Sequence, residues 1–363
     1  MPTLITRGSI SARSYGFGAS TGGLIPFNGF NTPAQMNGST TSASMTSVTV
    51  NSSGLFVAVG YNGSGYPLYA TSSNGSTWTT PAQMNGSSVR YYMTSVTVNS
   101  SGLFVAVGYD GNNYPLYATS SDGSTWTTPA KMNGSTTSAH MTSVTVNSSG
   151  LFVAVGYNGS GTYALYATSS DGSTWTTPAL MNGSTTVAHM TSVTVNSSGL
   201  FVAVGYNNSG NYPFYATSSD GSTWTTPAQM NGSATSALMT SVTVNSSGLF
   251  VAVGYNSPGY PLYATSSNGS TWTTPAQMNG SSVKYIMSSV TVNSSGLFVA
   301  VGYDNNIYPL YAKSSNGSTW TTPALMNGST TSARMTSVTV NSSGLFVAVG
   351  YDGNNYPLYA TSN

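Results

Sequence analysis

Two histidines, His140 and His189, are the only histidines of the chain, and they occupy equivalent positions in neighbouring copies of one repeated segment. Imidazole is a common metal ligand, but a protein zinc site needs three or four ligands. The chain has no cysteine and no carboxylate near this pair in sequence. We therefore expect no metal and no other cofactor. The simplest interpretation makes both histidines exposed loop residues, and the alternative is that they contact a ligand.

The acidic residues also argue against catalysis. The chain has six aspartates and no glutamate. Hydrolysis of a glycosidic bond requires two carboxylates about 5 to 10 Å apart. Here the aspartates are spread over five repeats and lie at turns, so close pairs are not expected. The sequence predicts a protein that is not an enzyme.

Cations beside aromatic residues point to binding instead. Arg90 is followed by Tyr91 and Tyr92, and Lys284 is followed by Tyr285. An aromatic ring has an apolar face on which a sugar can stack, and a cation adds hydrogen-bond donors. These residues are candidates for ligand contact. The further candidates are Tyr66, Asp110, His140, His189, Asp304, Arg334 and Asp352.

The candidates lie between the copies of a segment, MTSVTVNSSGLFVAVGY in its commonest form, that recurs seven times with a period of 48 or 49 residues. A period in this range with several short strands per repeat is typical of a β-propeller. The serine directly before the Val-Thr-Val of the segment lies at Ser47, Ser95, Ser143, Ser192, Ser241, Ser289 and Ser337.

Each repeat predicts four strands. In the first repeat, alternating and continuous apolar runs predict strands at Ser47–Asn51, Leu55–Tyr61, Pro67–Ser72 and Thr77–Gln83. Asn74-Gly75 predicts a tight hairpin with both residues at positive φ. Helix signals are absent.

The two ends of the repeat array predict a closed ring. The last repeat, residues 335–363, lacks a fourth strand, and FNTPAQM in residues 26–36 matches the fourth strand WTTPAQM of the first repeat. The fold prediction is an all-β, seven-bladed β-propeller with four antiparallel strands per blade, in which the N-terminal segment supplies the outer strand of the last blade. The alternative is a β-solenoid. Residues 1–25 lie outside the propeller of residues 26–363.

Differences between the repeats collect at two connections. One joins the fourth strand to the next repeat's first strand, and the other joins the second strand to the third. Both connections emerge on the same side of a four-stranded blade, here named the variable face. Most charged residues outside the N-terminal segment lie on it. Drift of tolerant loops would explain such variation, but we favour binding for the face as a whole.

The composition limits the partners. Charged residues make up 4% of the chain and the net charge is +1, so the basic surface that binds nucleic acid is not expected. Apolar runs fall short of the roughly 20 residues that cross a bilayer, so membrane insertion is not expected. The N-terminus lacks the apolar segment of a secretory signal. We expect a location outside the cell or on a virion surface, reached by another route.

One motif resembles a known family. Ser120–Trp126, SSDGSTW, resembles the Asp-box S-x-D-x-G-x-x-W of sialidase-type propellers, with a loop one residue shorter. The resemblance covers six of the seven blades, and Asp122, Asp171 and Asp220 keep the acid. It implies the propeller fold through a structural turn. A sialidase also requires a Tyr/Glu pair, which a chain without glutamate cannot form, so the resemblance does not extend to the activity.

A second resemblance concerns Leu4–Gly18, which is similar to N-termini of phage and virus tail or appendage proteins. We therefore expect a lectin-like recognition module that binds a glycan or cell-surface receptor multivalently through the variable face. The alternative is a structural virion or appendage protein, attached to other such proteins through residues 1–25.

Overall fold

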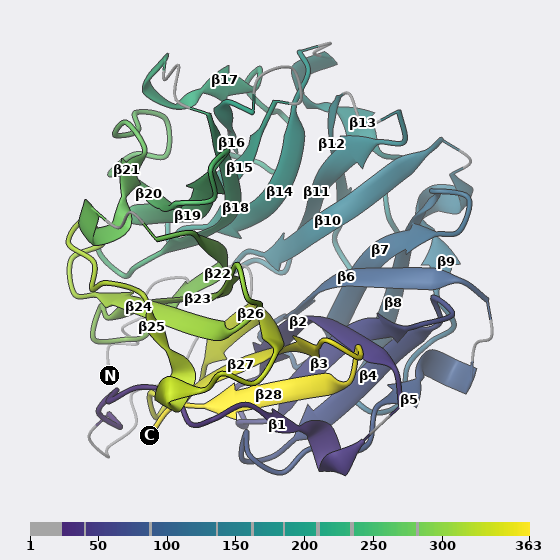
Figure 1. Ribbon diagram of the computed structural model, residues 1–363. Helices are drawn as coiled ribbons and strands as arrows, with labels where there is room; N and C mark the ends of the chain where they lie inside the picture. The colour runs from purple at the N-terminus through teal and green to yellow at the C-terminus, as the bar shows by residue number, and fades with distance from the viewer. Residues whose placement is uncertain are drawn as a thin grey trace, which may run out of the picture.

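The computed structural model describes residues 24–39, 41–86, 89–135, 137–160, 163–183, 186–207, 211–232, 236–280 and 283–363. These residues form seven four-stranded antiparallel sheets around a common centre (Figure 1). The predicted seven-bladed β-propeller is confirmed. In blade 1 the order from the centre outward is β2 (Ala43–Val50), β3 (Phe56–Asn62), β4 (Pro67–Ser72) and β5 (Ala82–Gln83).

The other blades repeat this order. Blade 2 holds β6 (Tyr91–Val98), β7 (Phe104–Asp110), β8 (Pro115–Ser120) and β9 (Ala130–Lys131). Blade 3 holds β10 (Ala139–Val146), β11 (Phe152–Asn158), β12 (Ala164–Ser169) and β13 (Ala179–Leu180). Blade 4 holds β14 (His189–Val195), β15 (Phe201–Tyr206), β16 (Pro213–Ser218) and β17 (Ala228–Gln229). Blade 5 holds β18 (Ala237–Val244), β19 (Phe250–Asn256), β20 (Pro261–Ser266) and β21 (Ala276–Gln277). Blade 6 holds β22 (Tyr285–Val292), β23 (Phe298–Asp304), β24 (Pro309–Ser314) and β25 (Ala324–Leu325).

Blade 7 joins the two ends of the chain. It contains β26 (Ala333–Val340), β27 (Phe346–Asp352) and β28 (Pro357–Thr361), and its outer strand is β1 (Ala34–Gln35). Ala34 pairs with Tyr359, and Phe30 forms a further bridge to Ser362. Figure 1 shows the purple strand β1 beside the yellow strand β28. The predicted closure is confirmed.

Apolar side chains fill the space between neighbouring blades. Val48 and Phe56 of blade 1 lie in one buried cluster with Val347 and Val349 of blade 7. Side chains of a strand point alternately to its two faces, so the apolar run of each second strand contributes to the cores on both sides. Met45 of the first strand is fully buried in the same cluster.

Buried hydrogen bonds link each inner strand to the next. Ser47 Oγ accepts the backbone N–H of Val96 in the following blade at 3.2 Å. The same bond recurs at every junction, and the last one runs from Val48 N–H to Ser337 Oγ at 3.1 Å. A closed circle of seven such bonds follows, which fixes every blade junction in the same register.

Several strand limits differ from the predictions. The first strand begins at Ala43 rather than Ser47 and bends at a bulge between Met45 and Ser47. The fourth strand contains two residues rather than seven, because Trp78 turns inward and Pro81 has no N–H to donate.

The turn prediction was also wrong in part. Gly75 has φ of +79°, but Asn74 does not have positive φ; its side chain accepts the N–H groups of Ser76 and Thr77 instead. A short 3-10 turn follows each fourth strand, although the sequence predicted no helical turns. These turns are η1 (Met36–Gly38), η2 (Met84–Gly86), η3 (Met132–Gly134), η4 (Met181–Gly183), η5 (Met230–Gly232), η6 (Met278–Gly280) and η7 (Met326–Gly328).

Within the described ranges, no helix is long and apolar enough to cross a membrane. The segment that resembles tail proteins, and residues 1–23 as a whole, lie outside the described residues.

Candidate functional site

The two variable connections meet on one face of the disc. The N–H of Tyr91, at the start of β6, donates to the carbonyl of Gly65 in the loop of the preceding blade at 2.8 Å. Tyr285 makes the same bond to Gly259 at 2.8 Å. The first strands of blades 1, 3, 5 and 7 are bonded to the second-to-third loop of the preceding blade in the same way, so the variable segments of these adjacent blades share one surface.

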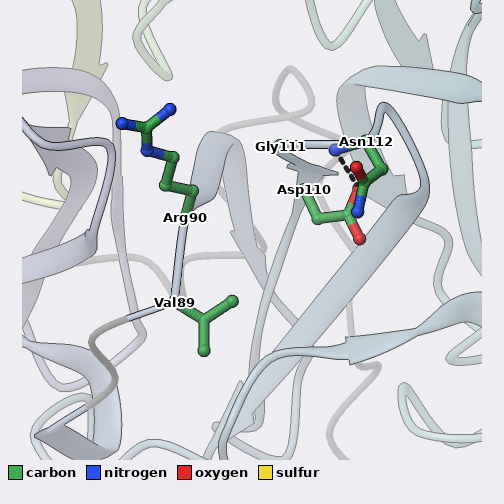
Figure 2. Close-up of a pocket in the computed structure, with 5 residues that line it drawn as sticks. All are labelled: Val89, Arg90, Asp110, Gly111 and Asn112. Atoms are coloured by element: carbon green, nitrogen blue, oxygen red, sulfur yellow. Dashed lines mark hydrogen bonds between the residues drawn. The ribbon is translucent and has the colours of Figure 1, made fainter.

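A hollow of about 340 Å³ lies on this face at blade 2. Val89 and Arg90, before β6, line one side, and Asp110, the last residue of β7, lines the other with Gly111 and Asn112. Figure 2 shows the Arg90 side chain extending away from the loop that carries Asp110. Val89 is 53% exposed, which is unusual for a branched apolar side chain in this protein. The structure thus brings two predicted candidates, Arg90 and Asp110, to one hollow and adds the exposed apolar side chain of Val89 to its lining.

Asp110 also has a structural task. Its Oδ1 accepts the backbone N–H of Asn112 at 2.9 Å and of Tyr114 at 2.8 Å. Asp304 and Asp352 hold their own loops by the same pair of bonds. The three candidate aspartates therefore shape turns, a role that Asn62 fills in blade 1 toward Ser64 and Tyr66.

Blade 6 repeats the arrangement of blade 2. Val283 is 53% exposed, like Val89, and Lys284 follows it where Arg90 follows Val89. Tyr285 pairs across the sheet with Asp304. Burial and the charge of Asp304 raise the pKa of the Tyr285 hydroxyl, so tyrosine and carboxylate lie close together. We call the surfaces around Val89–Arg90 and Val283–Lys284 the two rim sites.

A second group of aromatic side chains follows the innermost strands. Each second strand carries a tyrosine at its last or next-to-last residue, and a residue of a first strand lies between consecutive tyrosines. Ring centroids are 4.0 to 5.2 Å apart along a continuous series of contacts. The series is Tyr61, Tyr92, Tyr109, His140, Tyr157, His189 and Tyr206.

Arg334 continues the series at blade 7. Its guanidinium lies 5.5 Å from the ring centroid of Tyr303 and 5.9 Å from that of Tyr351. Such cation–π contacts hold the guanidinium between the rings. Arg334 was predicted to lie in a connecting loop, but it belongs to β26, because the first strands begin earlier than the sequence indicated.

The tyrosines at the ends of the second strands form a closed circle. Burial, together with the next tyrosine of the circle, raises the pKa of several of them; that of Tyr109 rises to about 12. These interactions connect Tyr61 to Tyr109 on one side and to Tyr351 on the other. We call this set the tyrosine circle; its members are Tyr61, Tyr109, Tyr157, Tyr206, Tyr255, Tyr303 and Tyr351.

The prediction that both histidines are exposed loop residues was wrong. His189 is 7% exposed in β14, and His140 lies in β10 with its ring nearly parallel to that of Tyr109, at 11°. Burial lowers the pKa of His140, and its Nε2 is buried without a hydrogen-bond partner. Over the described ranges, no group of three or more His, Cys, Asp or Glu side chains could hold a metal ion.

Sequence reasoning missed Val89, Val283 and the tyrosine circle. The valines follow serines in the two repeats that also carry Tyr91 and Tyr285, so comparing whole segments rather than charges would have found them. The circle is encoded by the invariant Gly-Tyr at the end of each second strand, which looks like ordinary packing in sequence. Tyr66 is partly buried at the base of its loop.

No family model and no curated protein matches the chain. Solved structures do match it. The BP39L lectin from Burkholderia pseudomallei is similar with a TM-score of 0.67 and 10% identity, over 89% of this chain and 96% of the lectin. YCF48 from Cyanidioschyzon merolae has a TM-score of 0.60 and 14% identity, over 91% and 98%. An ulvan lyase of polysaccharide lyase family PL25 has a TM-score of 0.56 and 11% identity, over 93% and 94%. At these identities the likeness concerns the fold.

Proposed function

We propose that this protein is a non-enzymatic module that binds carbohydrate through its variable face. The observation that carries the proposal is the hollow at blade 2, which is lined by exposed Val89, by Arg90 and by the loop that begins at Asp110. An apolar patch suits the C–H face of a sugar, and the polar groups around it suit the hydroxyls. The rim site of blade 6 repeats this chemistry with lysine in place of arginine.

The aspartates favour binding over catalysis. Fold alone does not decide between the two, since similar propellers include a lectin and a polysaccharide lyase. In this chain the carboxylate of the hollow, Asp110, accepts hydrogen bonds from the backbone N–H groups of its own turn. Three more aspartates accept backbone N–H groups in the turns between the third and fourth strands, on the opposite face: Asp122, Asp171 and Asp220.

Two rim sites, in blades 2 and 6, lie on nearly opposite sides of the disc. A glycan-coated surface can occupy both at once, so that weak single-site binding, of about millimolar to micromolar Kd, becomes tight attachment.

The chain supplies its own control residues for a test. Blades 3 and 7 carry Thr-Ser-Ala where blades 2 and 6 carry Val-Arg-Tyr and Val-Lys-Tyr. We expect the exchange Val89→Thr, Arg90→Ser and Tyr91→Ala, together with the same exchange at Val283, Lys284 and Tyr285, to lower binding to a glycan array at least tenfold. Either exchange alone should reduce surface attachment and leave single-site affinity, measured by calorimetry, in place.

Asn74→Asp is the matched control, because it exchanges one natural turn residue for another on the opposite face. Absence of glycan binding by the unmodified protein, or full binding by the doubly exchanged protein, would disprove the proposal. Glycan cleavage that a single aspartate substitution abolishes would show an enzyme instead.

A further inference from the structure

The series of side chains between the circle tyrosines is interrupted at one blade junction. Seven positions separate neighbouring members of the tyrosine circle, one in each first strand. Six carry a large side chain and the seventh carries serine. In chain order the residues are Ser44, Tyr92, His140, His189, Leu238, Ile286 and Arg334.

The junction that contains Ser44 is as tightly assembled as the others. Between blades 7 and 1, Val48 N–H lies 3.1 Å from Ser337 Oγ, and Thr336 Oγ1 lies 2.7 Å from the carbonyl of Met45. The corresponding distances between blades 2 and 3 are 3.2 and 2.6 Å. Since the strands are equally spaced, Tyr351 and Tyr61 must stand as far apart as the tyrosines of the other junctions.

His140 shows what that separation accommodates. Its flat ring lies between Tyr109 and Tyr157, with centroid distances of 4.0 and 5.0 Å. At Ser44 the same two walls are present, but the side chain between them is too short to fill the space. Ser44, Tyr61 and Tyr351 are all partly exposed to solvent, so this space is reached from the variable face.

The chemistry around Ser44 is polar at its edges and aromatic on its walls. Ser44, Tyr61 and Tyr351 each bring one hydroxyl group to this junction. The guanidinium of Arg334, at the neighbouring position, lies 5.9 Å from the ring centroid of Tyr351. Tyrosine rings stack on the C–H faces of sugars, and a guanidinium binds carboxylates well.

We propose that Tyr351, Ser44 and Tyr61, with Arg334 beside them, form a single further binding site, the seam site, which takes one pyranose ring between the two tyrosines. A partner's aromatic side chain would fit the walls equally well, but it would leave the hydroxyls at the edge of the site without partners. The seam site binds the same class of ligand as the rim sites and in that respect rests on the proposed function, although it shares no residue with them.

The test exchanges residues that occur naturally at this position in different blades. Ser44→His reproduces blades 3 and 4, and His140→Ser opens an equivalent gap between Tyr109 and Tyr157. Saturation-transfer NMR with the methyl glycosides of glucose, galactose, mannose, fucose, N-acetylglucosamine and glucuronic acid reports ring contact with the protein. N-acetyltyrosinamide serves as the aromatic probe, and Asn74→Asp is again the control on the opposite face.

We expect at least one glycoside to lose its signal fivefold or more in Ser44→His, to keep it in the rim exchange of blades 2 and 6, and to gain signal in His140→Ser. A stronger signal for the glucuronide than for the glucoside, lost in Arg334→Leu, would assign the role of Arg334. Full glycoside binding by Ser44→His overturns the seam site and leaves the rim sites standing. Binding of the tyrosine derivative alone assigns the gap to an aromatic side chain and also overturns the proposal.

Discussion

Replacing Phe30 by alanine measures how strongly the N-terminal strand closes the ring. Phe30 is 1% exposed, and its ring lies 5.3 Å from that of Phe27 and 5.7 Å from that of Tyr311, both edge to face. Removing a fully buried phenylalanine side chain costs about 3 to 5 kcal/mol. We expect Phe30→Ala to lower the free energy of unfolding by about 4 kcal/mol.

A comparison within another blade separates closure from ordinary packing. Trp224 occupies the position of Phe30 in blade 4, and its Nε1 donates to the carbonyl of Gly221 at 2.9 Å. Trp224→Phe keeps an aromatic ring at that position and removes the hydrogen bond, which is worth about 1 kcal/mol. This variant should therefore lose about a quarter of the stability that Phe30→Ala loses.

Urea unfolding followed by circular dichroism and by tryptophan fluorescence provides the measurement, and coincident transitions establish that the ring unfolds as one unit. All six tryptophans lie in blades 1 to 6. A Phe30→Ala variant within 1 kcal/mol of the unmodified protein would refute the conclusion that residues 24–36 hold the ring shut.

Two further predictions concern titration. The first concerns three aspartates, Asp122, Asp171 and Asp220. Hydrogen bonds from the backbone N–H groups of Thr125, Thr174 and Thr223, respectively, hold the pKa of these carboxyl groups well below the usual range. A depressed pKa stabilises the fold above about pH 4, and that contribution is lost as the pH falls. Changing all three to asparagine should flatten the fall of the urea midpoint between pH 4 and 2 and leave the midpoint at pH 7 nearly unchanged; an equally steep acid transition would contradict this. Burial raises the pKa of Tyr109 to about 12, so the fold loses stability as the pH rises above about 10. Tyr109→Phe should remove one titrating tyrosine from the absorbance change at 295 nm above pH 11. If the substitution instead removes a group that titrates near pH 10, the burial of Tyr109 is contradicted.

The sequence was sufficient for the architecture because the repeat is nearly identical in all blades. Seven copies of one strand pattern, with one copy divided between residues 26–36 and 335–363, allow few arrangements other than a closed ring. The limits of the outer strands were predicted less well. Whether Thr77–Gln83 forms a strand depends on the packing of Trp78 against its own turn, which the alternation of side-chain types does not reveal.

The candidate sites were predicted in part, for a physical reason. Charge and aromatic content identified Arg90 and Lys284, which the structure places on the predicted face. His140 and Arg334 were expected in loops. The bulge near the start of the first strands interrupts the alternation of apolar and polar residues, so the sequence pattern does not show that the strand extends beyond it toward the N-terminus. The stacking of Tyr109 on His140 joins two neighbouring blades across 31 residues of chain (140 − 109), so it is visible only in three dimensions.

The closure of blade 7 also determines how the protein faces its surroundings. Asn28 N–H donates to the carbonyl of Asn363 at 3.1 Å, and Ile25 N–H donates to that of Ser343, in a turn between a first and a second strand, at 2.8 Å. Those turns lie on the side of the disc opposite the variable face, so the chain enters and leaves the ring on the same side. A carrier attached at either point would hold the disc by its back and turn the rim sites and the seam site outward.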